Sequence, residues 1–310
     1  MFGHEMVNVA RETIGLAGPL DAAVSLEVLR RPGDDLLDRW DGTRLVRALR
    51  LAGRALPYAA RPVGTIEEPA LEVTVANPAD LADAVASARA AFPGDPAALA
   101  ALAAVDPAIA LLAARYPGLR PLRQPDLFNA LVRAISAQQV NLRWAATLRR
   151  RLAEMTGQRH TVDGHEVWSL DPAVVAGLRV ADVRALQFTT RKAEYIVGVA
   201  AAVAEGRLDL DGLGALPDDE VIRRLTAIRG LGMWTAEWIL ARTLGRPRVV
   251  AGDLGVRKAV GLAYPRLGDP LPPEGVVRAA TAHWGDAALL AQALALQELA
   301  VMAPTPIAPA

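Results

Sequence analysis

The chain has 310 residues with no net charge at pH 7, and 52% of its residues are hydrophobic. This length suits two or three packed units with a large core. Because the sequence has no cysteine, disulfides, a thiol nucleophile and cysteine-held metal centres are excluded. The four histidines show no metal-ligand spacing. We find neither a membrane-spanning apolar run nor a signal-peptide pattern, and therefore expect a cytoplasmic protein without membrane contact.

Residues 1–92 predict an α+β unit built on an antiparallel sheet. The segments AAVSLEVLRR, RLVRALRLAG and ALEVTVANP are rich in β-formers or alternate in polarity, and Gly, Pro and Asp separate them. The segment ADLADAVASARAAF has apolar residues at helical spacing and predicts one helix in this unit.

Residues 93–302 predict a two-part helical region. Asp95-Pro96, Asp106-Pro107 and Asp171-Pro172 each match an N-cap followed by proline at the first helical position. The expected helices are 96–104, 107–115, 125–137, 141–156, 172–176, 180–185, 189–205, 217–227, 232–244, 253–264, 273–283 and 286–302. The proline-rich tail 303–310 has no periodicity and predicts disorder.

Two stretches of this neutral chain are basic. Residues 221–258 contain eight Arg or Lys residues against two acids, and residues 120–158 contain seven against two. Such runs fit either solvated helix faces or surfaces that bind a nucleic acid, and charge alone does not separate these alternatives.

The segment IRGLG joins the expected helices 217–227 and 232–244 as a tight hairpin. Gly230 and Gly232 allow the backbone to turn with positive φ. The turn leaves the first amides of the second helix without intrahelical partners, which creates an anion site suited to a DNA phosphate. An ordinary helix–turn–helix corner explains the glycines equally well.

The residues around this hairpin resemble a known family. The pattern comprises Leu225, Ile228, Gly230, Leu231, Gly232, Thr235 and Ala236, followed by Asp253 in GDLGVRKA. It is similar to the helix–hairpin–helix Gly/Pro…Asp DNA glycosylase superfamily, in particular its AlkA-like 3-methyladenine DNA glycosylase II group. The likeness covers roughly residues 120–265. It implies a mainly α fold with an N-terminal α+β domain and the helix–hairpin–helix at about 217–244.

The resemblance implies a DNA glycosylase that flips a damaged base out of double-stranded DNA and hydrolyses its N-glycosidic bond, the first step of base excision repair. Its substrates would be alkylated purines such as 3-methyladenine and 7-methylguanine. Asp253 would be the catalytic carboxylate beside the cationic sugar. Asp253 also fits an N-cap, and the two roles are compatible. Bifunctional relatives have a nucleophilic lysine where this chain has Trp234, so we expect water as the nucleophile and no lyase activity.

The resemblance also suggests the remaining site residues. Trp234 and Trp238 lie four apart on one helix face, and with Trp284 they would line a pocket that attracts cationic bases, although Trp238 also fits a core position. Gln139, or else Gln138, would fill the gap in the DNA stack, although this segment also fits a polar loop between helices. The expected phosphate-binding residues are Arg229, Gly230, Gly232, Trp234 and Thr235.

No cofactor is expected for the chemistry. The family implies a structural Na⁺ or K⁺ at the carbonyls of Thr226, Ile228 and Leu231. We expect a monomer that meets DNA in the nucleoid. The alternatives are a glycosylase of the same fold for oxidised or deaminated bases, a non-catalytic helix–hairpin–helix DNA-binding protein and, more distantly, a small-molecule α+β enzyme.

Overall fold

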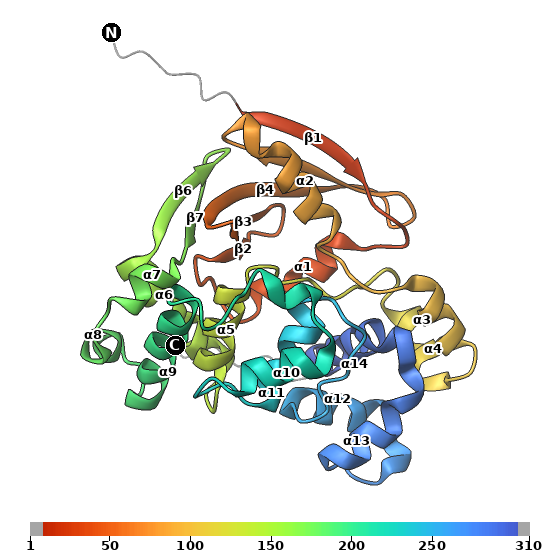
Figure 1. Cartoon of the computed structure of the whole chain (residues 1–310). Coiled ribbons are helices and arrows are strands. Elements are labelled where there is room, and N and C mark those ends of the chain that lie inside the picture. The colour runs from red at the N-terminus through yellow and green to blue at the C-terminus, as the bar shows by residue number, and fades with distance from the viewer. Residues whose placement is uncertain (1–8, 303–310) are drawn as a thin grey trace, which may run out of the picture.

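The N-terminal unit is an antiparallel sheet, as the sequence predicts. The computed structural model describes residues 9–302. Within that range the larger sheet has five strands in the order β1-β5-β4-β3-β2, and every neighbouring pair is antiparallel (Figure 1). The strands are β1 (Ala10–Gly15), β2 (Asp38–Trp40), β3 (Leu45–Leu51), β4 (Arg54–Gly64) and β5 (Pro69–Val75).

One segment expected to join the sheet forms a helix instead. AAVSLEVLRR lies in α1 (Ala22–Arg30). Asp21 caps this helix, because its carboxylate accepts a hydrogen bond from the amide of Val24 at 3.0 Å. Leu26 and Leu29 bury the same helix face against the sheet. Helical capping and spacing therefore outweigh the β-propensity of the valines and leucines.

The predicted helical region is confirmed, with ends that shift by one to a few residues. Its helices are α3 (Pro96–Ala103), α4 (Pro107–Arg115), α5 (Leu127–Ala137), α6 (Leu142–Thr156), α7 (Pro172–Ala176), α8 (Val180–Ala185), α9 (Thr190–Ala204), α10 (Asp218–Thr226), α11 (Met233–Trp238), α12 (Leu254–Ala263), α13 (Glu274–Thr281) and α14 (Ala288–Met302). Helix α2 (Leu81–Arg89) covers the sheet, as expected. Asp95, Asp106 and Asp171 each cap the helix that follows, with proline at its start.

A β-hairpin interrupts the helical region where no strand was predicted. Strands β6 (Gln158–Val162) and β7 (His165–Ser169) pair in an antiparallel manner. Their turn is Asp163-Gly164, and both residues have positive φ, which is typical of a two-residue hairpin turn. The hairpin packs on the N-terminal sheet through Val162 and Val167. Figure 1 shows it standing beside β3 and β4.

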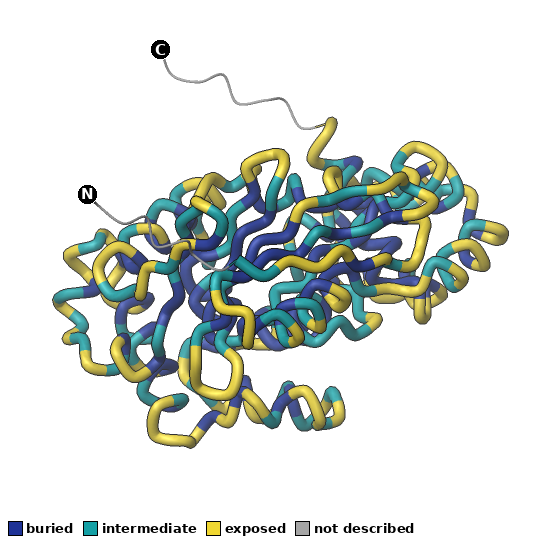
Figure 2. Tube along the Cα trace, turned by 90° about the horizontal axis from the view of Figure 1, so that it is seen from above, coloured by how far each residue is buried: buried dark blue, intermediate teal, exposed yellow. Residues whose placement is uncertain are grey.

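A buried ion cluster links the sheet unit to the helices. Asp35 accepts a hydrogen bond from the guanidinium of Arg149 on α6 at 2.8 Å and lies 3.0 Å from that of Arg133 on α5. Asp38 pairs with Arg47 of β3 at 2.9 Å. In Figure 2 most buried segments lie in the interior and most exposed segments lie at the periphery. The division at residue 92 stays a prediction, and the tail 303–310 lies outside the described residues.

In the part of the chain that the structure describes, no helix is long and apolar enough to cross a membrane.

Candidate functional site

The helix–hairpin–helix forms where the sequence predicts it, between α10 and α11. Gly230 has φ of +96°, which L side chains rarely adopt, and a Cβ at this position would lie 2.3 Å from the ring of Tyr195. Gly232 is the N-cap of α11 with φ of −106°, and a Cβ there would meet no atom within 4 Å. Gly230 is therefore required by conformation and packing, whereas Gly232 leaves open space in front of the helix.

Asp253 caps α12 and is held by two tryptophans. Its Oδ1 accepts a hydrogen bond from the amide of Val256 at 3.0 Å. Its Oδ2 accepts hydrogen bonds from Nε1 of Trp234 at 2.8 Å and from Nε1 of Trp238 at 3.2 Å. The helix cap and the indole pair therefore fix both oxygens of the carboxylate. A carboxylate offers about four lone-pair sites, so roughly one site on Oδ1 stays available to a ligand.

Asp253 lies in the wall of a large cleft. The cleft has a volume of about 1010 Å³ and brings together four segments that are distant in the sequence. It is lined by Ala137, Gln138, Gln139, Val140, Asn141, Leu142, Thr189, Arg191, Lys192, Tyr195, Gly232, Trp234, Thr235, Asp253, Leu254 and Gly255. The predicted carboxylate, wedge loop and hairpin thus border one space. Trp238 does not line the cleft but donates a hydrogen bond to Asp253.

The wedge loop, which contains Gln138 and Gln139 and is expected to fill the gap in the DNA stack, lines the cleft. Its two glutamines differ in exposure and in hydrogen bonding. Gln139 is exposed and has φ of +54°, so the backbone turns sharply and presents its side chain at the loop tip. Gln138 donates a hydrogen bond from Nε2 to the carbonyl of Gly230 at 3.0 Å. Gln138 therefore ties this loop to the hairpin, which leaves Gln139 as the better wedge.

Lys192 is a cleft residue that the sequence does not reveal. Its side chain is buried, and Nζ donates a hydrogen bond to the carbonyl of Ser136 at 2.8 Å. Burial lowers the pKa of this amine below its usual value. The sequence pattern favours a solvated helix start at Arg191 and Lys192, which holds for exposed Arg191 and is wrong for Lys192.

Trp284 does not belong to the cleft, so its expected role in the base pocket is wrong. The residue is 2% exposed, and its Nε1 donates a hydrogen bond to the hydroxyl of Tyr264 at 2.9 Å. That hydroxyl and His283 both contact Asp106, the N-cap of α4. The aromatic side chain therefore serves the core that joins α4 to the C-terminal helices.

Most arginines of the basic stretch 221–258 form ion pairs with acids of the same chain. Arg223 and Arg224 pair with Glu220, and Arg246 pairs with Asp218. Arg229, expected at a phosphate, is exposed at the hairpin and pairs with Glu194 at 3.0 Å. Arg143, Arg191 and Lys258 are exposed and form no ion pair within residues 9–302. The local excess of charge thus overstated the number of side chains available to DNA.

The hairpin carbonyls have the donor chemistry for a monovalent cation. The carbonyl of Ile228 accepts one hydrogen bond, from the amide of Leu231 at 3.1 Å. Among residues 9–302, no loop or turn amide donates a hydrogen bond to the carbonyl of Thr226 or to that of Leu231. Among residues 9–302, no group of three or more His, Cys, Asp or Glu side chains could hold a metal ion.

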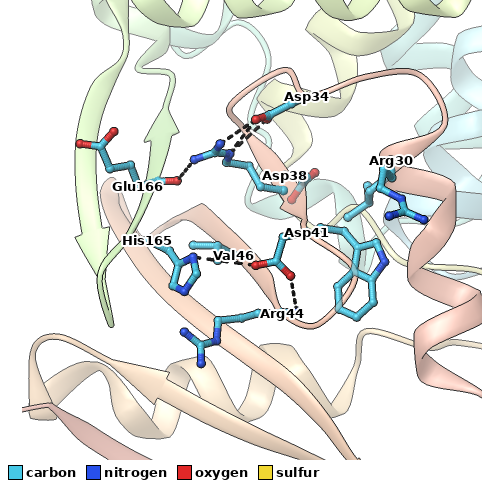
Figure 3. A pocket seen from close by; sticks show the side chains of 11 residues that line it. Arg30, Asp34, Asp38, Asp41, Arg44, Val46, His165 and Glu166 are labelled. Atoms are coloured by element: carbon cyan, nitrogen blue, oxygen red, sulfur yellow. Dashed lines mark hydrogen bonds and ion pairs between the residues drawn. The ribbon is translucent and has the colours of Figure 1, made fainter.

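A second pocket, of about 160 Å³, lies between the N-terminal sheet and the β6–β7 hairpin (Figure 3). Its carboxylates already have partners. Asp34 pairs with Arg39, and Asp41 accepts hydrogen bonds from the amides of Thr43 and Arg44 at 2.7 and 2.8 Å. These backbone hydrogen bonds lower the pKa of Asp41, although burial opposes them. Arg39 also donates a hydrogen bond to the carbonyl of Glu166 in β7, so the side chains of this pocket connect the hairpin to the sheet.

The sequence reasoning missed the apolar side chains at the rim of the cleft. Leu142 is 61% exposed and Leu254 is 54% exposed, although both line the cleft. Each lies at the first position of its helix, directly after the N-cap residue, Asn141 or Asp253. A large apolar residue at such a position is the signal that could have revealed them.

Comparison with known proteins agrees with this arrangement. Residues 132–279 match the family described as HhH-GPD superfamily base excision DNA repair protein. A DNA-3-methyladenine glycosylase of Bacillus subtilis is 34% identical over 147 residues, which cover 47% of this chain and 48% of the relative. The chain thus spans about half the length of the curated relatives it matches.

Solved structures show the fold over nearly the whole chain. A 3-methyladenine DNA glycosylase from Archaeoglobus fulgidus has a TM-score of 0.79 at 22% identity and covers 95% of this chain and 100% of its own. An 8-oxoguanine glycosylase/lyase from Clostridium acetobutylicum, solved with double-stranded DNA, has a TM-score of 0.69 at 15% identity and covers 94% of this chain and 97% of its own. The predicted mainly α fold with an N-terminal antiparallel sheet is confirmed.

Proposed function

We propose that this protein is a monofunctional DNA glycosylase for alkylated purines in double-stranded DNA, since residues 132–279 match the family described as HhH-GPD superfamily base excision DNA repair protein. The supporting observation is Asp253, a carboxylate fixed by two indole N–H groups and a helix amide at the wall of the cleft. Similarity to a relative named DNA-3-methyladenine glycosylase supports the substrate class.

The geometry suggests how the bond breaks. The flipped nucleotide enters the cleft, and the C1′–N bond breaks as the base leaves with the bonding electrons. The sugar acquires oxocarbenium character, which the fixed charge of Asp253 stabilises. Water then adds to C1′ and loses a proton toward the free lone pair of Oδ1 or to solvent. A cationic methylated purine departs as a neutral molecule, so the reaction needs no proton from a histidine.

Water is the nucleophile in this proposal because Trp234 stands where a lyase would have its lysine. Lys192 lines the cleft, but its amine donates to the carbonyl of Ser136. The expected products are a free base and an intact abasic strand. A strand cut by the protein without added alkali would contradict the monofunctional part of the proposal.

DNA would be held by the hairpin and by exposed basic side chains that form no ion pair among the described residues. The amides at Gly230, Gly232, Trp234 and Thr235, with exposed Arg229, would contact one phosphate, and Arg143, Arg191 and Lys258 would contact others. A Na⁺ or K⁺ at the carbonyls of Thr226, Ile228 and Leu231 would add positive charge there. DNA affinity should therefore fall when a bulky organic cation replaces K⁺ at constant ionic strength. We further propose that the protein acts as a monomer in the cytoplasm.

The decisive experiment compares two N-cap aspartates. Asp253→Asn should abolish release of 7-methylguanine from methylated DNA while DNA affinity stays within about twofold, because only the charge beside the sugar is lost. Asp95→Asn removes the same charge from the N-cap of α3, outside the cleft, and should leave the release rate unchanged. If Asp253→Asn worked at the wild-type rate, or if the wild type released no methylpurine, the proposal would fail.

A further inference from the structure

The wedge loop, which joins α5 to α6, holds a conformation that its own residues do not favour. Gln139 has φ of +54°, in the left-handed region that residues other than glycine rarely adopt. Such a backbone persists only where the surrounding structure fixes it. Gln138 supplies one such contact through its hydrogen bond to the carbonyl of Gly230 on the hairpin. The end of α5 requires a second contact, because the last carbonyls of a helix have no intrahelical partner.

Lys192 supplies this second contact from α9. Its Nζ donates a hydrogen bond at 2.8 Å to the carbonyl of Ser136, in the last turn of α5. No loop or turn amide among residues 9–302 donates to that carbonyl. Helix α5 has no basic residue of its own in its last turn, where a positive charge is favourable. The ammonium of Lys192 therefore caps α5 from a neighbouring helix.

Both ends of the wedge loop are fixed by side chains. The hydroxyl of Ser136 accepts a hydrogen bond from the guanidinium of Arg149 at 3.0 Å. At the other end Asn141 caps α6, because its Oδ1 accepts a hydrogen bond from the amide of Trp144 at 2.8 Å. Of the two basic side chains that bind Ser136, only Lys192 also lines the cleft. Its contact with the loop therefore borders the space that the flipped base would enter.

We propose that Lys192 is a positioning residue for base flipping, which holds the end of α5 so that Gln139 already stands at the loop tip before DNA binds. A loop that is ordered in the free protein loses little further conformational entropy when it inserts into the duplex. The benefit arises when a base has to leave an intact stack, because the wedge then fills the gap. A base that is already unpaired needs the wedge much less. This inference rests on the proposed function and assigns a residue to its flipping step.

The test compares base release from two substrates under single-turnover conditions. Lys192→Met keeps the unbranched stem of the side chain but removes the ammonium. Release of 7-methylguanine from a fully paired duplex should fall about tenfold, because a charge-assisted hydrogen bond is lost, while release from an unpaired bulge stays within about twofold. The rate on the bulge also shows whether the variant is folded and whether its catalytic carboxylate still works.

Lys258→Met is the matched control, since it removes the charge of the chain's other lysine, which is exposed on α12. Any weaker binding of DNA would act on both substrates alike, so the ratio of the two rates should equal that of the wild type. Lys192→Gln, which keeps a polar end without the charge, should show the same selective loss as Lys192→Met and serves if the Met variant unfolds.

A double variant separates direct from indirect action. If Lys192 acts through the wedge, Lys192→Met combined with Gln139→Ala should release 7-methylguanine from the paired duplex no more slowly than Gln139→Ala alone. Effects that multiply would show that Lys192 acts independently of Gln139, and an equal fall on both substrates would show that it supports the whole site. Either result overturns the inference, as does an unchanged rate for Lys192→Met. A wild type that releases no methylpurine would refute the proposed function instead.

Discussion

At the scale of single residues, the two hairpin glycines carry different constraints although they belong to one motif. Gly230 needs positive φ and room against Tyr195, whereas Gly232 needs neither. Gly230→Ala should lower the free energy of unfolding by about 2 kcal/mol or more, since conformational strain and a steric clash combine. Gly232→Ala, its matched control, should stay within about 0.5 kcal/mol. Urea unfolding measures both, and equal losses would contradict the distinction.

The indole N–H groups at Asp253 give a second residue-scale prediction. Trp238→Phe keeps an aromatic ring but removes the donor at 3.2 Å from Oδ2. We expect the rate of base release to fall about tenfold, because a charge-assisted hydrogen bond that orients the carboxylate contributes roughly 1.5 kcal/mol or more. Trp144→Phe, on α6, should have no effect. Single-turnover rates check this prediction, and an unchanged rate for Trp238→Phe would show that the indole only fills space.

The sequence predicted the position of some site residues correctly and of others wrongly. The residues after Asp253 predicted that this carboxylate caps a helix, and the structure has that cap, whereas the hydrogen bond from Trp234 was not predicted. Trp284 and Lys192 were misplaced, because an aromatic ring suits a core as well as a pocket and a lysine can bury its amine on a helix carbonyl. Tertiary packing decides such cases, and sequence periodicity does not report it.

At the scale of elements, the wedge loop and the hairpin form one unit through Gln138. Gln139 stands free at the tip. Gln139→Ala should slow base release from a fully paired duplex about tenfold, because nothing then fills the gap left by the flipped base. It should slow release much less when the lesion lies in an unpaired bulge. Equal slowing on both substrates would show that Gln139 does not act as a wedge.

Local signals predicted helices better than strands. Asp-Pro pairs fixed the starts of α3, α4 and α7, since a capping carboxylate and the fixed φ of proline act within one turn. The β6–β7 hairpin escaped notice although Asp163-Gly164 is a strong turn signal, because its apolar face is satisfied only by the distant sheet. The strand expected at AAVSLEVLRR failed where Asp21 supplied a helix cap.

At the scale of the whole molecule, Asp126 couples the sheet unit to the helices and should make stability depend on pH. This buried N-cap of α5 accepts a hydrogen bond from the amide of Arg50 in β3 at 2.9 Å, and burial raises its pKa to about 6. The unfolded chain has a pKa near 4 at this carboxyl. The folded state therefore holds the proton more tightly, and this contribution to stability is lost as pH rises from about 4 to about 6.

Asp126→Asn removes that dependence. The free energy of unfolding of the variant, relative to the wild type, should rise by about 2 kcal/mol between pH 4 and pH 7. Denaturant titrations at several pH values measure it, and a difference that stays flat would contradict the assignment. Asp95→Asn, at an exposed helix cap, should show little change over the same range.

The fluorescence of the two tryptophans that bind Asp253 should also report on the arrival of a base in the cleft. Two indoles donate to one carboxylate oxygen, so their emission reports the charge at that atom, and a purine entering the cleft beside them would quench it. Arrival of a base could therefore be timed in unlabelled protein, separately from the breaking of its bond. Fluorescence would then distinguish lesions that reach the cleft and leave intact from lesions that never enter it.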